Sequence, residues 1–213
     1  MMADYQSFDG HGVDVAVNRA DDLDKKSLGY IAEHLGCHVL DVGSGAGGQS
    51  IRMAEVGANV VAVDQFDFSE KFSKYEKDNL RFVLGDIVNL RQLLTEEKFD
   101  IAICQRTIHY LQYDAAVASL TALRSFVSDK LFISVTGTGS LVGDTYFAAN
   151  KPLPDRFAEL APLGKEMFQI NESVCLYNEV EFRQLLTAAG WRVDECWASA
   201  FGNIKAICSN TTS

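Results

Sequence analysis

The chain has 213 residues, of which 47% are hydrophobic and 23% charged, close to the averages for globular proteins. This composition excludes a disordered or fibrous chain, and the length fits one generous domain. The 19 basic and 29 acidic residues give a formal net charge of −10, which argues against a protein that wraps a nucleic-acid backbone.

Residues 1–20 are polar and irregular and are expected to form an N-terminal arm. A helix is predicted from Asp21 to about Leu35, because apolar residues recur at three- to four-residue spacing. Apolar strands then alternate with helices, which predicts a parallel sheet covered on both faces. The predicted strands cover residues 37–42, 59–63, 80–84, 99–104 and 130–135. The predicted helices between them cover residues 49–56, 69–78, 90–97 and 113–127.

The alternation breaks after the fifth strand. Residues 139–176 mix glycine, proline and aromatic residues, hold all three prolines of the chain, and are expected to contain a short helix near 156–160. Beyond them, the pattern predicts a helix over 179–189, strands over 191–198 and 203–208, and a disordered tail over 209–213. The connection between the last two strands is too short for a parallel crossover, so they must form an antiparallel hairpin.

A glycine-rich loop follows the first predicted strand, with the sequence Asp41-Val42-Gly43-Ser44-Gly45-Ala46-Gly47. Glycines allow a tight turn and close approach of a ligand, and the next helix presents free N–H groups there. The pattern G-x-G-x-x-G is also present, and Asp64 lies 21 residues after Gly43, near the spacing of a dinucleotide-binding carboxylate. Spacing alone therefore leaves NAD open as the ligand.

Two further carboxylates favour a cationic ligand instead. Asp41 lies two residues before the first glycine, where its negative charge would face the pyrophosphate of NAD but would suit a ligand with an amino group. Asp86 follows the third predicted strand, so it should share the carboxyl-end rim of the sheet with Asp41 and Asp64.

This set of motifs resembles the class I S-adenosylmethionine-dependent methyltransferases. Residues 41–47 are similar to that family's first motif, Val63-Asp64 to its second, Gly85-Asp86-Ile87 to its third, and residues 99–105 to its fourth. The resemblance covers about residues 21–208. It implies the Rossmann-like methyltransferase fold, a doubly wound, mostly parallel seven-stranded α/β sheet whose last strand is antiparallel and inserts between strands five and six.

The resemblance also implies S-adenosylmethionine as the cofactor and assigns roles to single residues. Asp41 would support the loop and the cofactor's amino group, Asp64 would accept hydrogen bonds from the ribose hydroxyls, and Asp86 would accept one from the adenine amino group. The expected cofactor-binding residues are Asp41, Gly43, Ser44, Gly45, Gly47, Asp64, Gln65, Asp86, Ile87 and Gln105.

The segment after the fourth strand should line the reaction site. Methyl transfer depends on alignment of donor and acceptor, and some acceptors also need a base. His109 and Tyr110 are candidates for the base or for substrate contacts, although both could instead pack on the sheet. Arg106 could bind a carboxylate of the substrate or pair with an acidic residue of the chain.

The sequence favours a small-molecule acceptor. Methyltransferases of nucleobase amines carry an Asp/Asn-Pro-Pro-aromatic tetrad where this chain has Cys104-Gln105-Arg106-Thr107, and the Pro-Cys pair of the cytosine-C5 enzymes is absent. Residues 139–176 are expected to cover the substrate, with residues 1–20 as a lid. Three alternatives stay open, namely methylation of a protein or tRNA, an NAD-binding oxidoreductase, and an inactive partner subunit.

Other features suggest a cytoplasmic protein without a membrane partner. No apolar run approaches the ~20 residues that cross a bilayer, and the N-terminus lacks the features of a secretory signal. The five cysteines form no C-x-x-C pair, and Gly36 interrupts the helix between His34 and His38, so no metal site is expected. The protein is expected to be a monomer or a homodimer.

Overall fold

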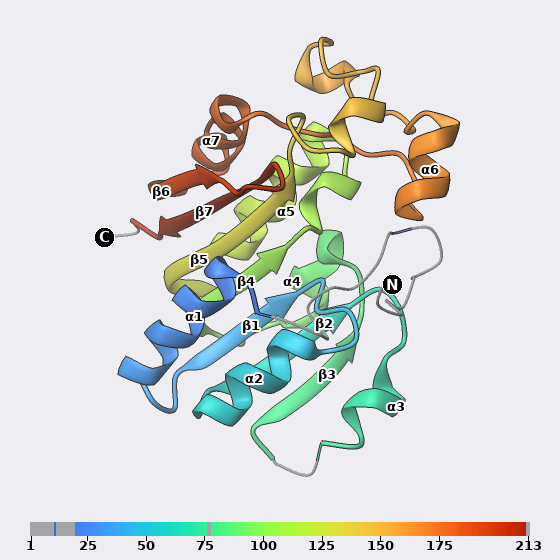
Figure 1. Ribbon diagram of the computed structural model, residues 1–213. Helices are drawn as coiled ribbons and strands as arrows, with labels where there is room; N and C mark the ends of the chain where they lie inside the picture. Colours follow the sequence, from blue (N-terminus) through green and yellow to red (C-terminus); the bar gives the residue numbers. More distant parts are fainter. Residues whose placement is uncertain (1–10, 12–19, 76–77, 212–213) are drawn as a thin grey trace.

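The computed structural model describes residues 11, 20–75 and 78–211. These residues form a seven-stranded sheet with helices on both sides (Figure 1). The strands are β1 (His38–Val42), β2 (Asn59–Asp64), β3 (Leu80–Leu84), β4 (Phe99–Gln105), β5 (Val127–Thr136), β6 (Arg192–Ala198) and β7 (Asn203–Ser209). Their order is β3-β2-β1-β4-β5-β7-β6. Strand β7 is antiparallel to both β5 and β6, whereas the other neighbouring pairs are parallel. The predicted fold class is confirmed.

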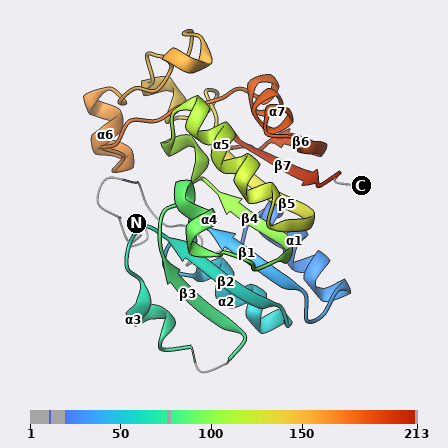
Figure 2. The same cartoon turned by 180° about the vertical axis from the view of Figure 1, so that it is seen from behind.

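Helices cover both faces of the sheet, as the unbroken apolar strands require. Helices α1 (Asp22–Glu33) and α2 (Gly48–Val56) pack on one face, and α4 (Leu90–Leu93), α5 (Tyr113–Arg124) and α7 (Glu179–Ala188) lie on the other (Figure 2). Successive residues of a strand point to opposite faces. Thus Val39 joins the core beneath α1 and α2, whereas Leu40 joins the core beneath α5 and α7.

Several predicted helices are shorter than expected. Helix α3 spans only Ser69–Phe72 instead of residues 69–78, because Phe72 is the only residue of this turn that is buried. The helix predicted over residues 113–127 ends at Arg124, since Val127 is the first residue of β5. Leu35, expected on the buried face of the first helix, is 72% exposed because α1 ends before it.

Residues 139–176 form a separate small layer beyond the carboxyl ends of the parallel strands (Figures 1 and 2). They contain the 3₁₀ turns η3 (Gly143–Thr145) and η4 (Leu153–Asp155) and helix α6 (Pro162–Phe168). The short helix predicted near residues 156–160 is wrong, because Ala158 makes an antiparallel bridge to Val174. The layer has its own apolar core, made by Tyr146, Ala148, Leu160, Ile170, Val174 and Leu176.

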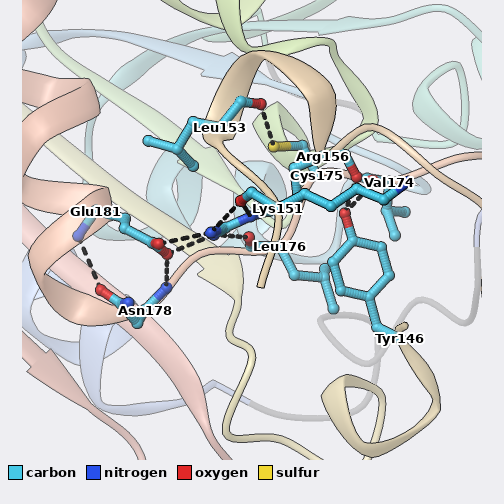
Figure 3. A network of polar contacts seen from close by, with 9 residues as sticks. All are labelled: Tyr146, Lys151, Leu153, Arg156, Val174, Cys175, Leu176, Asn178 and Glu181. Atoms are coloured by element: carbon cyan, nitrogen blue, oxygen red, sulfur yellow. Dashed lines mark hydrogen bonds and ion pairs between the residues drawn. The ribbon is translucent and has the colours of Figure 1, made fainter. Parts of the chain in front are cut away.

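A buried ion pair fastens this layer to α7 (Figure 3). Arg156 is 4% exposed and donates to both carboxylate oxygens of Glu181, at 2.6 and 2.7 Å. It also donates to the carbonyl oxygens of Lys151 and Leu176. Glu181 in turn forms a capping box with Asn178 at the start of α7, so one arginine ties three stretches of chain together.

The predicted disordered tail starts too early at residue 209. Ser209 pairs with Lys130 of β5, and the side-chain amide of Asn210 donates to the carbonyl oxygens of Arg124 and Val127. Residues 212–213 lie outside the described residues, as does most of the predicted arm, 1–10 and 12–19. Among the described residues, no helix is long and apolar enough to span a membrane.

Candidate active site

A cavity of about 1240 Å³ lies at the carboxyl edge of the sheet, beneath the layer formed by residues 139–176. It is lined by the ends of the first four strands, the start of α1 and the β6–β7 hairpin. The predicted site residues that line it are Asp41, Gly43, Ser44, Gly45, Asp64, Gln65, Asp86, Ile87, Gln105, Arg106, His109 and Tyr110. Gly47 alone among the predicted set is outside the lining.

The glycine loop is hydrogen-bonded to the end of β2 on one side and packs closely against Thr107, after β4, on the other. The backbone N–H groups of Gly43 and Ser44 donate to the carbonyl oxygen of Val63, at 2.8 and 3.2 Å. Gly43 has φ +71°, and a Cβ there would lie 1.9 Å from the Thr107 Oγ1 atom. Gly47 has φ +83° and precedes α2, so it shapes the backbone rather than the cavity. The loop therefore depends on glycine where it passes the segment after β4.

Three carboxylates lie at the ends of neighbouring strands. Asp41 is 3% exposed and accepts from the Ser50 hydroxyl at 2.6 Å. Asp64 accepts from the N–H of Gly45 at 2.8 Å and from the N–H of Phe66, two residues further along the chain, at 3.0 Å. Asp86 accepts from a backbone N–H at 3.1 Å and caps the 3₁₀ turn η1 (Ile87–Asn89). Local donors thus fix each carboxylate at the cavity wall.

Sequence reasoning missed a charged group contributed by the start of α1. Asp21, Asp22 and Asp24 line the cavity, and the buried amine of Lys205 from β7 pairs with the first two, at 2.5 Å for Asp21. Gln105 donates to Asp24, whose pKa is raised by burial. The acidic run is visible in the sequence, but it is typical of a helix start, and Asp21 does cap α1.

Arg106 has an unusual backbone conformation, and its side chain stands out among the charged groups of the cavity wall. Its φ is +52°, a left-handed conformation that non-glycine residues rarely adopt, and its N–H donates to the Ser134 carbonyl oxygen at 2.8 Å. The side chain lines the cavity. Among the described residues, none forms an ion pair or side-chain hydrogen bond with it.

His109 is 1% exposed and lines the cavity, and its Nδ1 atom has no hydrogen-bond partner among the described residues. Burial lowers the pKa of His109 to about 3, and the charge of Arg106 acts in the same direction. The imidazole is therefore neutral near pH 7 and is a weak base.

Tyr110 lies in the cavity wall and contacts His11, the one described residue among positions 1–19. Its hydroxyl donates to the His11 carbonyl oxygen at 2.7 Å, and burial raises its pKa, so the phenol stays protonated. The His11 ring lies 4.8 Å from the Tyr110 ring, and its backbone bridges to Ile170. His11 thus covers part of the cavity, and neither Tyr110 nor His109 is poised to remove a proton near neutral pH.

Comparison with family models matches residues 33–188 to the family described as a methyltransferase domain. The match spans well over half of the chain, so this chain belongs to that family, the class I S-adenosylmethionine-dependent methyltransferases. An NAD-binding oxidoreductase is thereby set aside. A comparison of the sequence with curated proteins finds no match. Among the described residues, no group of three His, Cys, Asp or Glu side chains could hold a metal ion.

Solved structures share the fold at low sequence identity. The 1,6-didemethyltoxoflavin-N1-methyltransferase of Burkholderia thailandensis, with S-adenosylhomocysteine bound, is 20% identical with a TM-score of 0.65, over 89% of this chain and 79% of that one. The magnesium protoporphyrin IX methyltransferase of Synechocystis PCC 6803 is 17% identical (TM-score 0.64, 88% and 82%). The CcbJ methyltransferase of Streptomyces caelestis is 13% identical (TM-score 0.66, 95% and 97%).

Proposed function

We propose that this chain transfers the methyl group of S-adenosylmethionine to a small molecule bound in the same cavity. The observation that carries the proposal is a single cavity that runs from the carboxylates at the ends of β1–β3 to Arg106, His109 and Tyr110. Its volume of about 1240 Å³ exceeds the ~300–1,000 Å³ of a typical one-ligand site, so it has room for a cofactor and a small acceptor.

The residues at the ends of β1–β3 fit the cofactor's hydroxyl and amino groups. Two backbone N–H groups orient the carboxylate of Asp64 at the cavity wall, where its oxygens would accept the two ribose hydroxyls. Asp86 would accept from the adenine amino group while capping η1, and Ile87 would pack against the ring.

The glycine loop and its surroundings fit the amino-acid end of the cofactor. A side chain at Gly43 would occupy the space next to Thr107, so the loop leaves its backbone open to a ligand. Ser44 and Gly45 continue this open stretch of backbone. Asp41 and Asp24 both line the cavity, and Gln105 donates to Asp24. These two carboxyl groups would lie beside the cationic amino group or sulfonium of the cofactor. When bound, S-adenosylmethionine supplies an electrophilic methyl group.

The acceptor would bind between the segment after β4 and residues 139–176. Because methyl transfer is an in-line displacement, alignment supplies much of the rate enhancement. The neutral His109 and the protonated Tyr110 are suited to orient an acceptor by hydrogen bonding rather than to deprotonate it. We infer that residues 21–208 form the methyltransferase domain, that residues 139–176 cover the acceptor, and that the arm acts as a lid through His11.

The charge of the protein supports a small acceptor over a nucleic acid. The formal net charge is −10, and the described residues that line the cavity include seven aspartates against Arg106 and Lys205. A polyanionic substrate would meet electrostatic repulsion at this opening. A protein substrate is not repelled in the same way, so the experiment must separate these two acceptors.

The test follows a labelled methyl group. Purified protein is incubated with methyl-labelled S-adenosylmethionine and an extract of the cells that produce it, and the products are separated by size. The proposal expects label in the small-molecule fraction, and loss of that label with the Asp64→Asn variant. Label recovered in the protein or RNA fraction would instead show a macromolecular acceptor.

A further inference from the structure

The two cations of the described cavity lining differ in how their charge is balanced. Lys205 is buried and paired with Asp21 and Asp22. Arg106 is half-buried, and among the described residues no carboxylate lies within ion-pair distance of it. A guanidinium cannot be deprotonated in a protein, so it cannot avoid this position by becoming neutral.

The backbone holds Arg106 in place despite its strain. With φ at +52°, the residue occupies a conformation that is unfavourable for a side chain with a Cβ atom. Such strain is kept where the surrounding structure fixes it, and it is concentrated at functional sites. Here the N–H of Arg106 remains bonded to Ser134 of β5, so the side chain leaves the end of β4 in a fixed direction.

The position of Arg106 favours the acceptor over the cofactor as its partner. Its charge acts on His109 and Tyr110, which lowers the pKa of His109 and opposes the burial that raises the pKa of Tyr110. Tyr110 packs against the small apolar core of residues 139–176. Arg106 therefore lines the cavity next to the residues that meet this layer.

A second observation points to a polar ligand group at the same place. The buried Nδ1 atoms of His109 and His11 have no hydrogen-bond partner among the described residues. Both rings lie against Tyr110, at centroid distances of 4.4 and 4.8 Å. Buried polar atoms are almost always hydrogen-bonded, so two orphaned nitrogens beside one unpaired cation indicate that a ligand completes the set.

The lining contributed by residues 139–176 is mainly apolar, with Ser140 and Asp144 as its polar members. Leu111, Val142, Phe168 and Ile170 line the cavity together with the ring of Tyr110. Most of these side chains belong to, or pack against, the small core of residues 139–176. A ligand that fills this space would therefore be largely apolar apart from the group that meets Arg106.

We propose that the methyl acceptor is a largely apolar carboxylic acid, and that Arg106 binds its carboxylate. The inference rests on the proposed function, because it names the acceptor class of that same site. An arginine and a carboxylate form two parallel N–H···O bonds, which fixes orientation as well as affinity. Arg106 would thus set the direction in which the acceptor presents its methyl-receiving atom.

The test compares matched acids and carboxamides on the protein saturated with S-adenosylhomocysteine. The probes are benzoate, salicylate, 2-naphthoate and indole-3-acetate, each paired with its neutral carboxamide, and affinities are measured by calorimetry. At least one acid should bind about 10- to 100-fold more tightly than its amide. In Arg106→Gln this preference should disappear, while the control Arg91→Gln, at an exposed site on α4, should keep it.

Three results would overturn the inference. The first is equal affinity for acid and amide across the set in the unmodified protein. The second is a preference that survives in Arg106→Gln. The third is weakened binding of S-adenosylhomocysteine by Arg106→Gln, which would assign the guanidinium to the cofactor's own carboxylate. Failure of the unmodified protein to bind S-adenosylhomocysteine would count against the proposed function itself, which keeps the two failures distinct.

Discussion

The two halves of the cavity are built in different ways. In the cofactor half, backbone N–H groups fix the carboxylates of Asp64 and Asp86. Each donor belongs either to the strand–loop junction that carries the carboxylate or to the neighbouring junction. In the acceptor half, the contacts join segments far apart in the sequence, such as Tyr110 with His11, 99 positions away. Short motifs thus hold the carboxylates of Asp64 and Asp86, whereas the acceptor half is assembled from contacts between distant segments. Substitutions in the cofactor half should therefore lower the stability of the whole domain, whereas substitutions in the acceptor half should affect only the residues around them.

The largest expected effect is that of Gly43→Ala in the cofactor half. The new Cβ would clash with Thr107 at a backbone conformation that alanine disfavours, and the two costs together come to about 2–5 kcal/mol of unfolding free energy. Urea unfolding measures this loss. Gly139→Ala is the control, because a Cβ there meets nothing within 4 Å, and its effect should stay within about 0.5 kcal/mol. Equal effects of both variants would refute the role given to the loop.

Arg156→Met breaks the anchor of the acceptor half. Removing one partner of a fully buried ion pair lowers the free energy of unfolding by about 3–5 kcal/mol. Because Glu181 is partly exposed, we expect Arg156→Met to lower it by about 2–3 kcal/mol. The loss should be confined to residues 139–176, which hydrogen exchange would show as faster exchange there and unchanged exchange in β1 and β2. Binding of S-adenosylhomocysteine should be unaffected. Uniformly faster exchange would mean that the two halves are one cooperative unit.

Asp86→Asn tests the adenine contact without removing the cap of η1, because an amide oxygen can still accept from the Val88 N–H. Losing a hydrogen bond to a charged acceptor should weaken S-adenosylhomocysteine binding roughly 10- to 100-fold in calorimetry. Asp114→Asn, an exposed change on α5, should leave the affinity unchanged. If the two variants bind alike, Asp86 serves only as a helix cap.

The smallest effect concerns the pH dependence of His109. Its pKa of about 3 in the folded protein lies below the ordinary value of 6.5, so the unfolded chain binds the extra proton first as pH falls. Between pH 7.5 and 5.5 this site should cost the folded state about 1.4 kcal/mol, whereas above pH 6.5 it contributes little. Unfolding free energies of the wild type and of His109→Gln at both pH values test this. Identical pH dependence in the two proteins would show that His109 is charged or exposed.

The sequence predicted most of the fold because its strands are local apolar runs bounded by glycine or polar residues. It also placed Asp41, Asp64 and Asp86 at one edge, since the carboxyl ends of parallel strands meet there. It could not show that Gln105 contacts Asp24, 81 positions away, or that Lys205 pairs with the start of α1.

The errors in the predicted helices have a related cause. The helix expected over residues 69–78 shrinks to one turn ending at Phe72, because Phe72 is the one buried side chain among the described residues of this stretch. The short helix expected near residues 156–160 is replaced by a bridge between Ala158 and Val174, which depends on the fold of the whole layer. Neither outcome is decided by neighbouring residues alone.

The central claim is that the carboxylates of β1–β3 hold S-adenosylmethionine, and calorimetry of S-adenosylhomocysteine with Asp64→Asn tests it most directly. Asp64 supports both the glycine loop and the proposed ribose contact, so the variant should bind at least about 100-fold more weakly than the wild type. Glu96→Gln, an exposed acidic site, should bind like the wild type. Unchanged affinity in Asp64→Asn, with the fold intact, would contradict the account.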